Sequence, residues 1–307
     1  MSISKRLPVT KTIDGEACCV YCDPTMYRSV PNFEPQDGDI IQVTFPRSGT
    51  NWVQQILQLI LYKGQSARTF NEFLDRAPVI ELHALKATQP PRLIRTHFPM
   101  TKIQVSPKAK YIYVARNPWD CCVSCFHMVQ EVPAYQYQDG TFDEFLDAFL
   151  DGQFGSGDYF DHVISGYSRR NDPNVFFLTY EELQRNKADL ILKLAYFLGN
   201  DHGERLELDV TAFQDILDKS TVAFMKGFLK TNPAEVREQL AKNSTGLQPS
   251  LATSFGDDGG GPTINVLRKG VVGDWKGYFS PENIGKMQAK IDEKAGGSDI
   301  ANIWKRV

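Results

Sequence analysis

The stretch Asp39-Ile-Ile-Gln-Val-Thr-Phe-Pro-Arg-Ser-Gly-Thr-Asn-Trp52 places a run of β-branched and aromatic residues directly before a glycine-containing turn. Residues 39–45 predict a buried strand. After the turn, residues 51–62 carry apolar side chains at helical spacing and predict a helix. A strand, a short turn and a helix in direct succession are typical of α/β folds, in which ligands bind where the strands end.

Further segments repeat this alternation along the chain. Apolar runs predict strands at 93–97, 110–116 and 175–180. Helices are predicted at 119–130, 142–150, 181–198 and 212–219. Continuous apolar strands that alternate with helices favour a central parallel sheet flanked by helices on both faces. We therefore expect a single α/β domain over residues 1–307, in which the polar, glycine-rich stretch 243–267 forms a flexible loop.

The composition describes a folded chain with no excess of basic residues. The 307 residues are 42% hydrophobic and 23% charged, which excludes a disordered, collagen-like or disulfide-scaffold chain. Lys and Arg total 34 and Asp and Glu total 37, so the net charge is −3. A nucleic-acid coat would carry a basic excess, so we expect no nucleic acid as partner. A local cluster of positive charge could still bind a small polyanion.

No window approaches about 18 consecutive apolar residues, and the N-terminus has no apolar stretch of signal-peptide length. We therefore expect a cytoplasmic protein that does not enter a membrane.

The six cysteines form two clusters, Cys18/Cys19/Cys22 and Cys121/Cys122/Cys125. Half of a zinc site, a regulatory disulfide and reduced structural thiols are the alternatives, and reduced thiols are favoured in this compartment.

The turn at 46–50 predicts an anion site. A helix N-terminus has unpaired N–H groups and a positive dipole end, and Gly49 would allow an anion to approach closely. Ser48 and Thr50 add hydroxyl groups and Arg47 adds a positive charge. The alternative is an ordinary helix capped by Thr50. The turn is not a Walker A loop, because the first glycine and the lysine of that motif are missing.

Two other segments of the chain also combine positively charged residues with a turn. Residues 116–124 follow the predicted strand 110–116 and begin with arginine, where a nucleotide hydrolase would carry a magnesium-binding aspartate. Residues 268–276 are basic and punctuated by glycines. Three such segments, two of them at strand carboxyl ends, predict a pocket for a ligand with more than one phosphate-like group.

These segments resemble the signatures of the cytosolic sulfotransferases, which move a sulfonate from 3′-phosphoadenosine 5′-phosphosulfate (PAPS) to a hydroxyl or an amine. Thr44–Trp52 resembles the family's T-Y-P-K-S-G-T-T-W with three substitutions. Arg116–Ser124 matches R-N-P-x-D-x-x-x-S, and Arg268–Lys276 matches R-K-G-x-x-G-D-W-K in full. The resemblance spans residues 39–279. It implies a P-loop-NTPase-like fold with a phosphosulfate-binding loop.

The resemblance also implies which residues bind the donor, whose product is 3′,5′-adenosine bisphosphate. The 5′-phosphosulfate would contact Arg47, Ser48, Gly49, Thr50, Asn51 and Trp52, the last packing on adenine. The 3′-phosphate would contact Arg116, Ser124, Arg268, Lys269 and Gly270. Tyr180 matches a family tyrosine near adenine, and Ser220 and Thr221 match a hydroxyl-bearing turn on the same ligand. No metal is implied.

For catalysis, His97 resembles the family's histidine in its K-T-H-x-P context and would be the general base. Without that resemblance, a histidine at a strand end is more often structural. Arg47 would stabilise charge on the leaving bisphosphate. The family usually has lysine at the positions of Arg47 and Arg95, and arginine is effectively never deprotonated, so we expect both to act electrostatically.

The acceptor is left open between a phenol, a catecholamine and a steroid. Tyr21, Phe70 and Tyr135 are expected on the acceptor side together with Arg95 and His97, although each aromatic residue alone fits a core equally well. Two other functions are alternatives: a nucleotide-kinase-like phosphoryl transferase and a catalytically idle nucleotide-binding relative. A homodimer is also left open, because the segment after Lys276 departs from the family's dimer motif.

Overall fold

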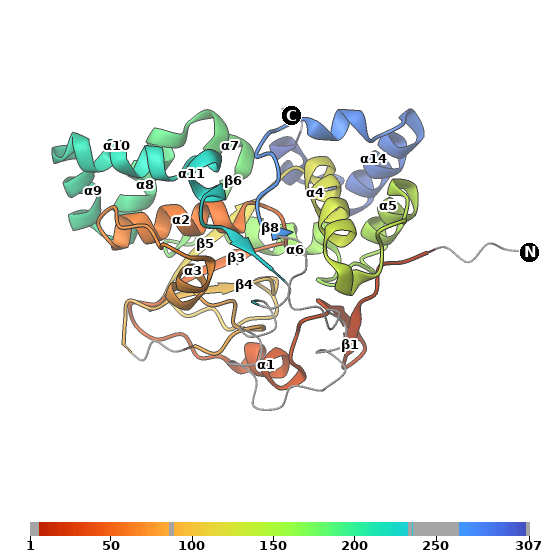
Figure 1. The fold of residues 1–307 in the computed structure, drawn as a ribbon, viewed down its shortest axis with the longest axis horizontal. Helices are drawn as coiled ribbons and strands as arrows, with labels where there is room; N and C mark the ends of the chain where they lie inside the picture. The colour runs from red at the N-terminus through yellow and green to blue at the C-terminus, as the bar shows by residue number, and fades with distance from the viewer. Residues whose placement is uncertain (1–5, 86–88, 233–234, 236–263, 305–307) are drawn as a thin grey trace, which may run out of the picture.

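The computed structural model describes residues 6–85, 89–232, 235 and 264–304. Its centre is a four-stranded sheet of order β4–β3–β5–β6, and every pairing in it is parallel (Figure 1). The strands are β3 (Ile40–Thr44), β4 (Leu93–Thr96), β5 (Lys110–Ala115) and β6 (Val175–Thr179). The predicted parallel sheet and all of its predicted strands are confirmed.

Alternate side chains of the strands enter two different apolar cores. Ile41, Val43 and Tyr113 face the core formed with α4 (Pro118–Glu131), α5 (Phe142–Leu150), α6 (Tyr159–Tyr167) and α14 (Pro281–Ala295). Ile40 and Ile112 face the core formed with α2 (Thr50–Leu61) and α8 (Lys187–Leu198). Figure 1 shows the two groups of helices on either side of the sheet. This alternation confirms that helices cover both faces.

The predicted helix 181–198 is two helices. Thr179 caps α7 (Tyr180–Arg185) through a capping box with Glu182, and the chain leaves helical geometry at Asn186, where ψ is 43°, before α8 begins. The predicted helix 212–219 begins two residues earlier, as α10 (Val210–Lys219). Its neighbour α9 (Asn200–Leu208) was not predicted, because its surface is largely polar.

Several short elements also carry no clear sequence pattern. They are β1 (Lys11–Ile13), β2 (Glu16–Cys18), α1 (Pro24–Ser29), α3 (Phe70–Arg76), α11 (Val222–Lys226), β7 (Lys230–Thr231) and β8 (Ile264–Asn265). Of the predicted loop 243–267, residues 243–263 lie outside the described residues. The last four are described, and two of them form β8, which pairs with β7. None of the described helices combines the length and apolar character needed to cross a membrane.

All six cysteines are free thiols. Those at 121, 122 and 125 are buried in α4. Within the described ranges, no group of three or more His, Cys, Asp and Glu side chains is arranged to hold a metal ion. The zinc alternative therefore has no support in this part of the chain.

Candidate active site

The loop between β3 and α2 leaves the helix N-terminus free of a side-chain cap. Gly49 occupies the cap position with φ of 103° and has no side chain with which to cap the helix, and no side chain of the described residues bonds to the first amides of α2. The hydroxyl of Thr50 instead pairs with that of Thr44 at 2.7 Å, so the alternative of a helix capped by Thr50 is wrong. A Cβ at position 49 would lie 2.8 Å from the ring of Tyr180. The loop therefore presents bare N–H groups, as an anion site requires.

Arg47 joins this loop to the second basic segment and to the residues just before the third. Its backbone is left-handed, with φ of 68°. Its side chain donates from Nε to the hydroxyl of Ser124 at 3.1 Å and from Nη1 to the carbonyl of Val266 at 3.1 Å. Burial lowers the pKa of Arg47, and the nearby charges of Arg116 and Arg268 lower it further. The fold therefore holds several positive charges close together around Arg47, although they repel one another.

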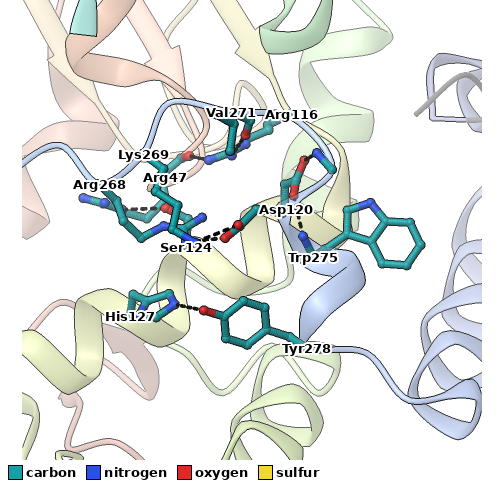
Figure 2. Close-up of polar contacts among 12 residues, drawn as sticks. Arg47, Arg116, Asp120, Ser124, His127, Arg268, Lys269, Val271, Trp275 and Tyr278 are labelled. Carbon is teal, nitrogen blue, oxygen red and sulfur yellow. Dashed lines mark hydrogen bonds and ion pairs between the residues drawn. The ribbon is translucent and has the colours of Figure 1, made fainter. Parts of the chain in front are cut away.

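Arg116 lies between the first and third segments (Figure 2). It donates to the carbonyl of Arg47 at 3.1 Å and to that of Val271 at 3.3 Å. Its guanidinium lies 4.5 Å from the ring centroid of Tyr180. Its buried Nε has no hydrogen-bond partner among the described residues. That donor is available to an anionic ligand.

The cations of the third segment share one carboxylate. Lys269 contacts Asp274 at 2.8 Å, and Arg268 contacts the other oxygen of the same group. Burial would raise the pKa of Asp274, but hydrogen bonds from Lys269 and Arg268 hold it below its usual value. The pairing places both cations beside Arg47 and Arg116.

A first cavity brings most of the predicted residues together. The predicted donor residues on its wall are Arg47, Gly49, Thr50, Asn51, Trp52, Arg116, Ser124, Tyr180, Arg268, Lys269 and Gly270. Tyr21, Phe70, Arg95 and His97, which were expected on the acceptor side, also line it. Val222 and Met225 line the same cavity and were not predicted as site residues.

Three predicted donor residues do not line this cavity. Ser48 is fully buried, with its hydroxyl 3.8 Å from the sulfur of Cys121. The carbonyl of Ser220 accepts from the indole N–H of Trp52 at 2.8 Å. Thr221 caps α11, accepting from the amide of Phe224 at 3.3 Å. The geometry gives these residues supporting contacts, and a direct contact of each with the donor stays a prediction.

His97 follows β4 and is held from two sides. Its Nδ1 lies 2.8 Å from the carbonyl oxygen of Thr44, and its backbone N–H donates to Glu81 at 2.7 Å. Because a carbonyl can only accept, Nδ1 carries the hydrogen and Nε2 has the lone pair. Burial lowers the pKa of His97, although Glu81 acts in the opposite direction. The neutral ring is therefore suited to accept a proton at Nε2.

Arg95 is held on the donor-loop side of the site. Its side chain is 2% exposed and donates from Nε to the carbonyl of Ala77 at 2.7 Å and from Nη1 to Asn51 Oδ1 at 3.0 Å. Its buried Nη2 has no partner among the described residues. Burial lowers the pKa of Arg95 to about 9, which still leaves it charged at neutral pH. Arg95 thus pairs with one of the three substituted positions of the first motif.

A second cavity of about 650 Å³ adjoins the first. Tyr21 and His97 line both cavities, Tyr135 lines only the second, and Phe70 and Arg95 line only the first. The aromatic and sulfur-bearing side chains of the second wall are Tyr21, Tyr27, Phe98, Tyr135, Phe154, Met128, Cys18, Cys19 and Cys22. Phe98 and Phe154 were not predicted. Phe98 directly follows His97 in the sequence, whereas Phe154 has no signal that would have identified it.

Comparison with known proteins agrees with this geometry. Residues 37–299 match the Sulfotransferase domain family. The chain is 32% identical to the amine sulfotransferase of Oryctolagus cuniculus, over 92% of this chain and 89% of that protein. It is 34% identical to Homo sapiens sulfotransferase 2B1, over 80% of this chain and 62% of that protein.

Among solved structures, mouse sulfotransferase SULT7A1 complexed with PAP superposes with a TM-score of 0.69 and 27% identity. The superposition covers 97% of this chain and 98% of that one. Sulfotransferases use PAPS as donor, and PAP is the product derived from it. The predicted resemblance, enzyme class and donor are confirmed. By this match over most of its length and by its fold, the chain belongs to the sulfotransferase family and is a transferase.

Proposed function

We propose that this enzyme transfers the sulfonate of PAPS to a small lipophilic acceptor, with His97 as the general base. The observation that carries the proposal is that His97 lies on the walls of both cavities. One cavity is lined by the three basic segments, and the other carries a group of aromatic and sulfur-bearing side chains. A sulfonate held in the first would therefore meet an acceptor held in the second beside this histidine.

The first cavity supports the donor assignment. The bare amides of α2 and the side chain of Arg47 suit the 5′-phosphosulfate, and Trp52 and Tyr180 offer ring faces for adenine. Arg116 has a free buried N–H for the 3′-phosphate, with Arg268 and Lys269 beside it. When bound, PAPS supplies the sulfonate that is transferred.

The chemistry follows from the tautomer of His97. Its Nε2 takes the proton of the acceptor hydroxyl while the acceptor oxygen forms a bond to sulfur. The bond between sulfur and the bridging oxygen breaks, and the electron pair stays with the leaving PAP. Arg47 stabilises the charge that develops on that oxygen. Thr44 keeps the ring in the tautomer that can accept the proton.

The second cavity favours an uncharged hydroxyl acceptor such as a phenol or a steroid. Its volume lies within the usual range of small-molecule pockets. Its carboxylates are already engaged: Glu81 accepts from His97 and Thr96, Glu16 pairs with Lys102, and Asp158 and Asp161 pair with Lys294. A cationic amine would have to displace one of these partners. Catecholamines and other amines are therefore the second acceptor class, which the similarity to an amine sulfotransferase supports.

The test is an acceptor panel with radiolabelled PAPS, in which phenols, sterols and amines compete for the wild-type enzyme. We expect transfer to a hydroxyl acceptor and, with His97→Ala, loss of transfer while PAP still binds. Transfer retained by His97→Ala would remove this residue as the base. Binding of PAP without transfer to any acceptor would favour the catalytically idle alternative, and turnover with ATP and magnesium would favour the kinase-like one.

The location and the oligomeric state belong to the proposal too. The similar curated proteins are cytosolic sulfotransferases, which supports the cytoplasm as the location. Cell fractionation tests it, and recovery in a membrane fraction would refute it. The homodimer stays a prediction, and analytical ultracentrifugation, which measures the mass of the protein in solution, tests it. Ser280 and Pro281, which replace the threonine and valine of the family's dimer motif, begin α14 as its cap and first residue.

A further inference from the structure

Three buried polar side chains form a chain of hydrogen bonds behind the donor cavity. Glu181, Asn117 and Asp120 are 4%, 0% and 0% exposed. We call these three side chains the polar relay. None of them lines the first cavity or was predicted as a site residue.

At one end of the relay, Asp120 holds the third basic segment through its backbone. Its Oδ2 accepts from the amide of Gly273 at 2.8 Å, and its Oδ1 accepts from the amide of Trp275 at 3.0 Å. Figure 2 shows this carboxylate beside Trp275, with Arg116 and Val271 close by. In sequence these contacts span 153 and 155 residues. A carboxylate that accepts two backbone N–H groups makes charge-assisted hydrogen bonds, which are stronger than neutral ones.

The other end of the relay reaches the segment that carries Tyr180. Asn117 donates from its side chain to Asp120 at 2.9 Å and to Glu181 at 2.7 Å. Its backbone N–H donates to the same oxygen of Glu181 at 2.9 Å. Asn117 also caps α4 by accepting from the amide of Asp120 at 2.8 Å. The relay thus ties the start of α4 to the start of α7.

Two relay residues are adjacent in sequence to donor-cavity residues, and the third holds the backbone of the third basic segment. Asn117 follows Arg116, Glu181 follows Tyr180, and the amides that Asp120 holds lie just beyond Gly270. Apolar packing holds the intervening turn weakly, because Val271 and Val272 are 42% and 36% exposed. The indole of Trp275 stacks on Trp119 at 5.7 Å, which fixes that side chain but leaves the backbone amides to Asp120.

We propose that Asp120 is a positioning residue for donor binding, which fixes the third basic segment against Arg116 and so shapes the 3′-phosphate site. This inference rests on the proposed donor site. Because Asp120 touches neither the cavity nor the reacting atoms, its loss should weaken binding of PAP and PAPS more than it slows the transfer step.

The test is Asp120→Asn, which keeps the volume but removes the charge and replaces one acceptor oxygen with a donor group. Four quantities are compared with the wild type: the Kd for PAP by calorimetry, KM for donor and acceptor, the unfolding temperature, and amide hydrogen exchange over residues 271–276. We expect the Kd for PAP and the KM for PAPS to rise about tenfold or more, and exchange in 271–276 to accelerate. The acceptor KM should stay near that of the wild type.

Asp143→Asn is the control for a carboxylate that bonds to a C-terminal element elsewhere. Asp143 on α5 accepts from the side chain of Asn283 at 2.6 Å, so it also joins a C-terminal element to the body of the protein, without contacting the third basic segment. We expect this variant to leave the Kd for PAP and the exchange of 271–276 unchanged. An equal loss of PAP binding in both variants would overturn the inference, because it would indicate that the whole fold is destabilised and not the third basic segment in particular.

An unchanged Kd for PAP in Asp120→Asn, or a raised Kd without faster exchange in 271–276, would also overturn it. If Asp120→Asn does not fold, Glu181→Gln tests the far end of the relay, and the Kd for PAP should rise about threefold. An unchanged Kd in that variant would refute the inference. A wild-type enzyme that fails to bind PAP would refute the proposed donor site itself, which distinguishes the two failures.

Discussion

Arg95 and Asn51 differ from the family pattern together, and the structure joins them by a hydrogen bond of 3.0 Å. We predict that these two positions are energetically coupled. Arg95→Lys restores the usual family residue at one position, and Asn51→Thr does so at the other. Arg95 reaches Ala77 through Nε and Asn51 through Nη1, and we expect a lysine to keep the bond to Ala77 and to lose the bond to position 51.

The magnitude follows from these contacts. A hydrogen bond of a charged group contributes about 1.5–3 kcal/mol, and the guanidinium also lies 5.2 Å from the ring centroid of Phe73. Arg95→Lys should therefore lower the free energy of unfolding by about 2–4 kcal/mol. Asn51→Thr should lower it by about 1.5–3 kcal/mol, because it leaves a second buried nitrogen of Arg95 without a partner. Both changes break the same bond, so the double variant should lose about 1–2 kcal/mol less than the sum.

The assay is urea unfolding of the wild type, the two single variants and the double variant. Arg92→Lys is the control substitution, because Arg92 is a second buried arginine of this region and bonds to Asp39 at 2.6 Å instead of Asn51. Its loss should add to that of Asn51→Thr within about 0.5 kcal/mol. If the double variant of Arg95→Lys and Asn51→Thr lost the sum of the two single losses, within the same margin of about 0.5 kcal/mol, the coupling would be refuted.

Three further predictions concern the two cavities. Because burial holds the pKa of His97 below 6.5, kcat/KM should stay level as the pH falls to that value and decline only below it; a decline centred above pH 6.5 would contradict the assigned base. Arg47→Ala should lower turnover about 10²-fold or more at saturating donor, and near-normal turnover would exclude the charge-stabilising role. A hydrogen bond from Cys22 is the main cause that lowers the pKa of Cys19, so alkylation of Cys19 by iodoacetamide should be half-maximal at a lower pH than that of an ordinary cysteine thiol. Cys22→Ala should shift that midpoint upward, and an unshifted midpoint would show that Cys22 does not set it.

The sheet and its two covering layers were predictable because burial imposes a periodicity on the sequence. The strand 40–44 and the helix 50–61 bury almost every side chain, and their apolar patterns are correspondingly clear. The helix 200–208 has no such pattern, and Leu208 is 87% exposed. The break at Asn186 was missed because apolar spacing continues on both sides of it.

The donor side of the site was predictable for a topological reason. Parallel strands end at one edge, so basic residues just beyond β3 and β5 had to meet there.

The second cavity was not predictable in this way. Its wall comes from the hairpin around Cys18, the turn around Cys22 and the loop near Phe154, which approach one another only through tertiary packing. Local periodicity carries no information on such contacts, and the same holds for Asp120 and its partners 153 and 155 residues away.

The net charge of −3 is an average over the whole chain, so it does not show the local group of positive charges at Arg47, Arg116, Arg268 and Lys269. Arg116 lies close enough to Arg47 that its charge helps to lower the pKa of Arg47. Their side-chain hydrogen bonds go to the carbonyls of Val266, Arg47 and Val271 and to the hydroxyl of Ser124, none of which is an anion. These hydrogen bonds orient the cations, and repulsion from Arg116 and Arg268 remains among the causes that lower the pKa of Arg47. A ligand with two separated anionic groups would relieve this repulsion, so the fold itself favours binding of the doubly phosphorylated donor.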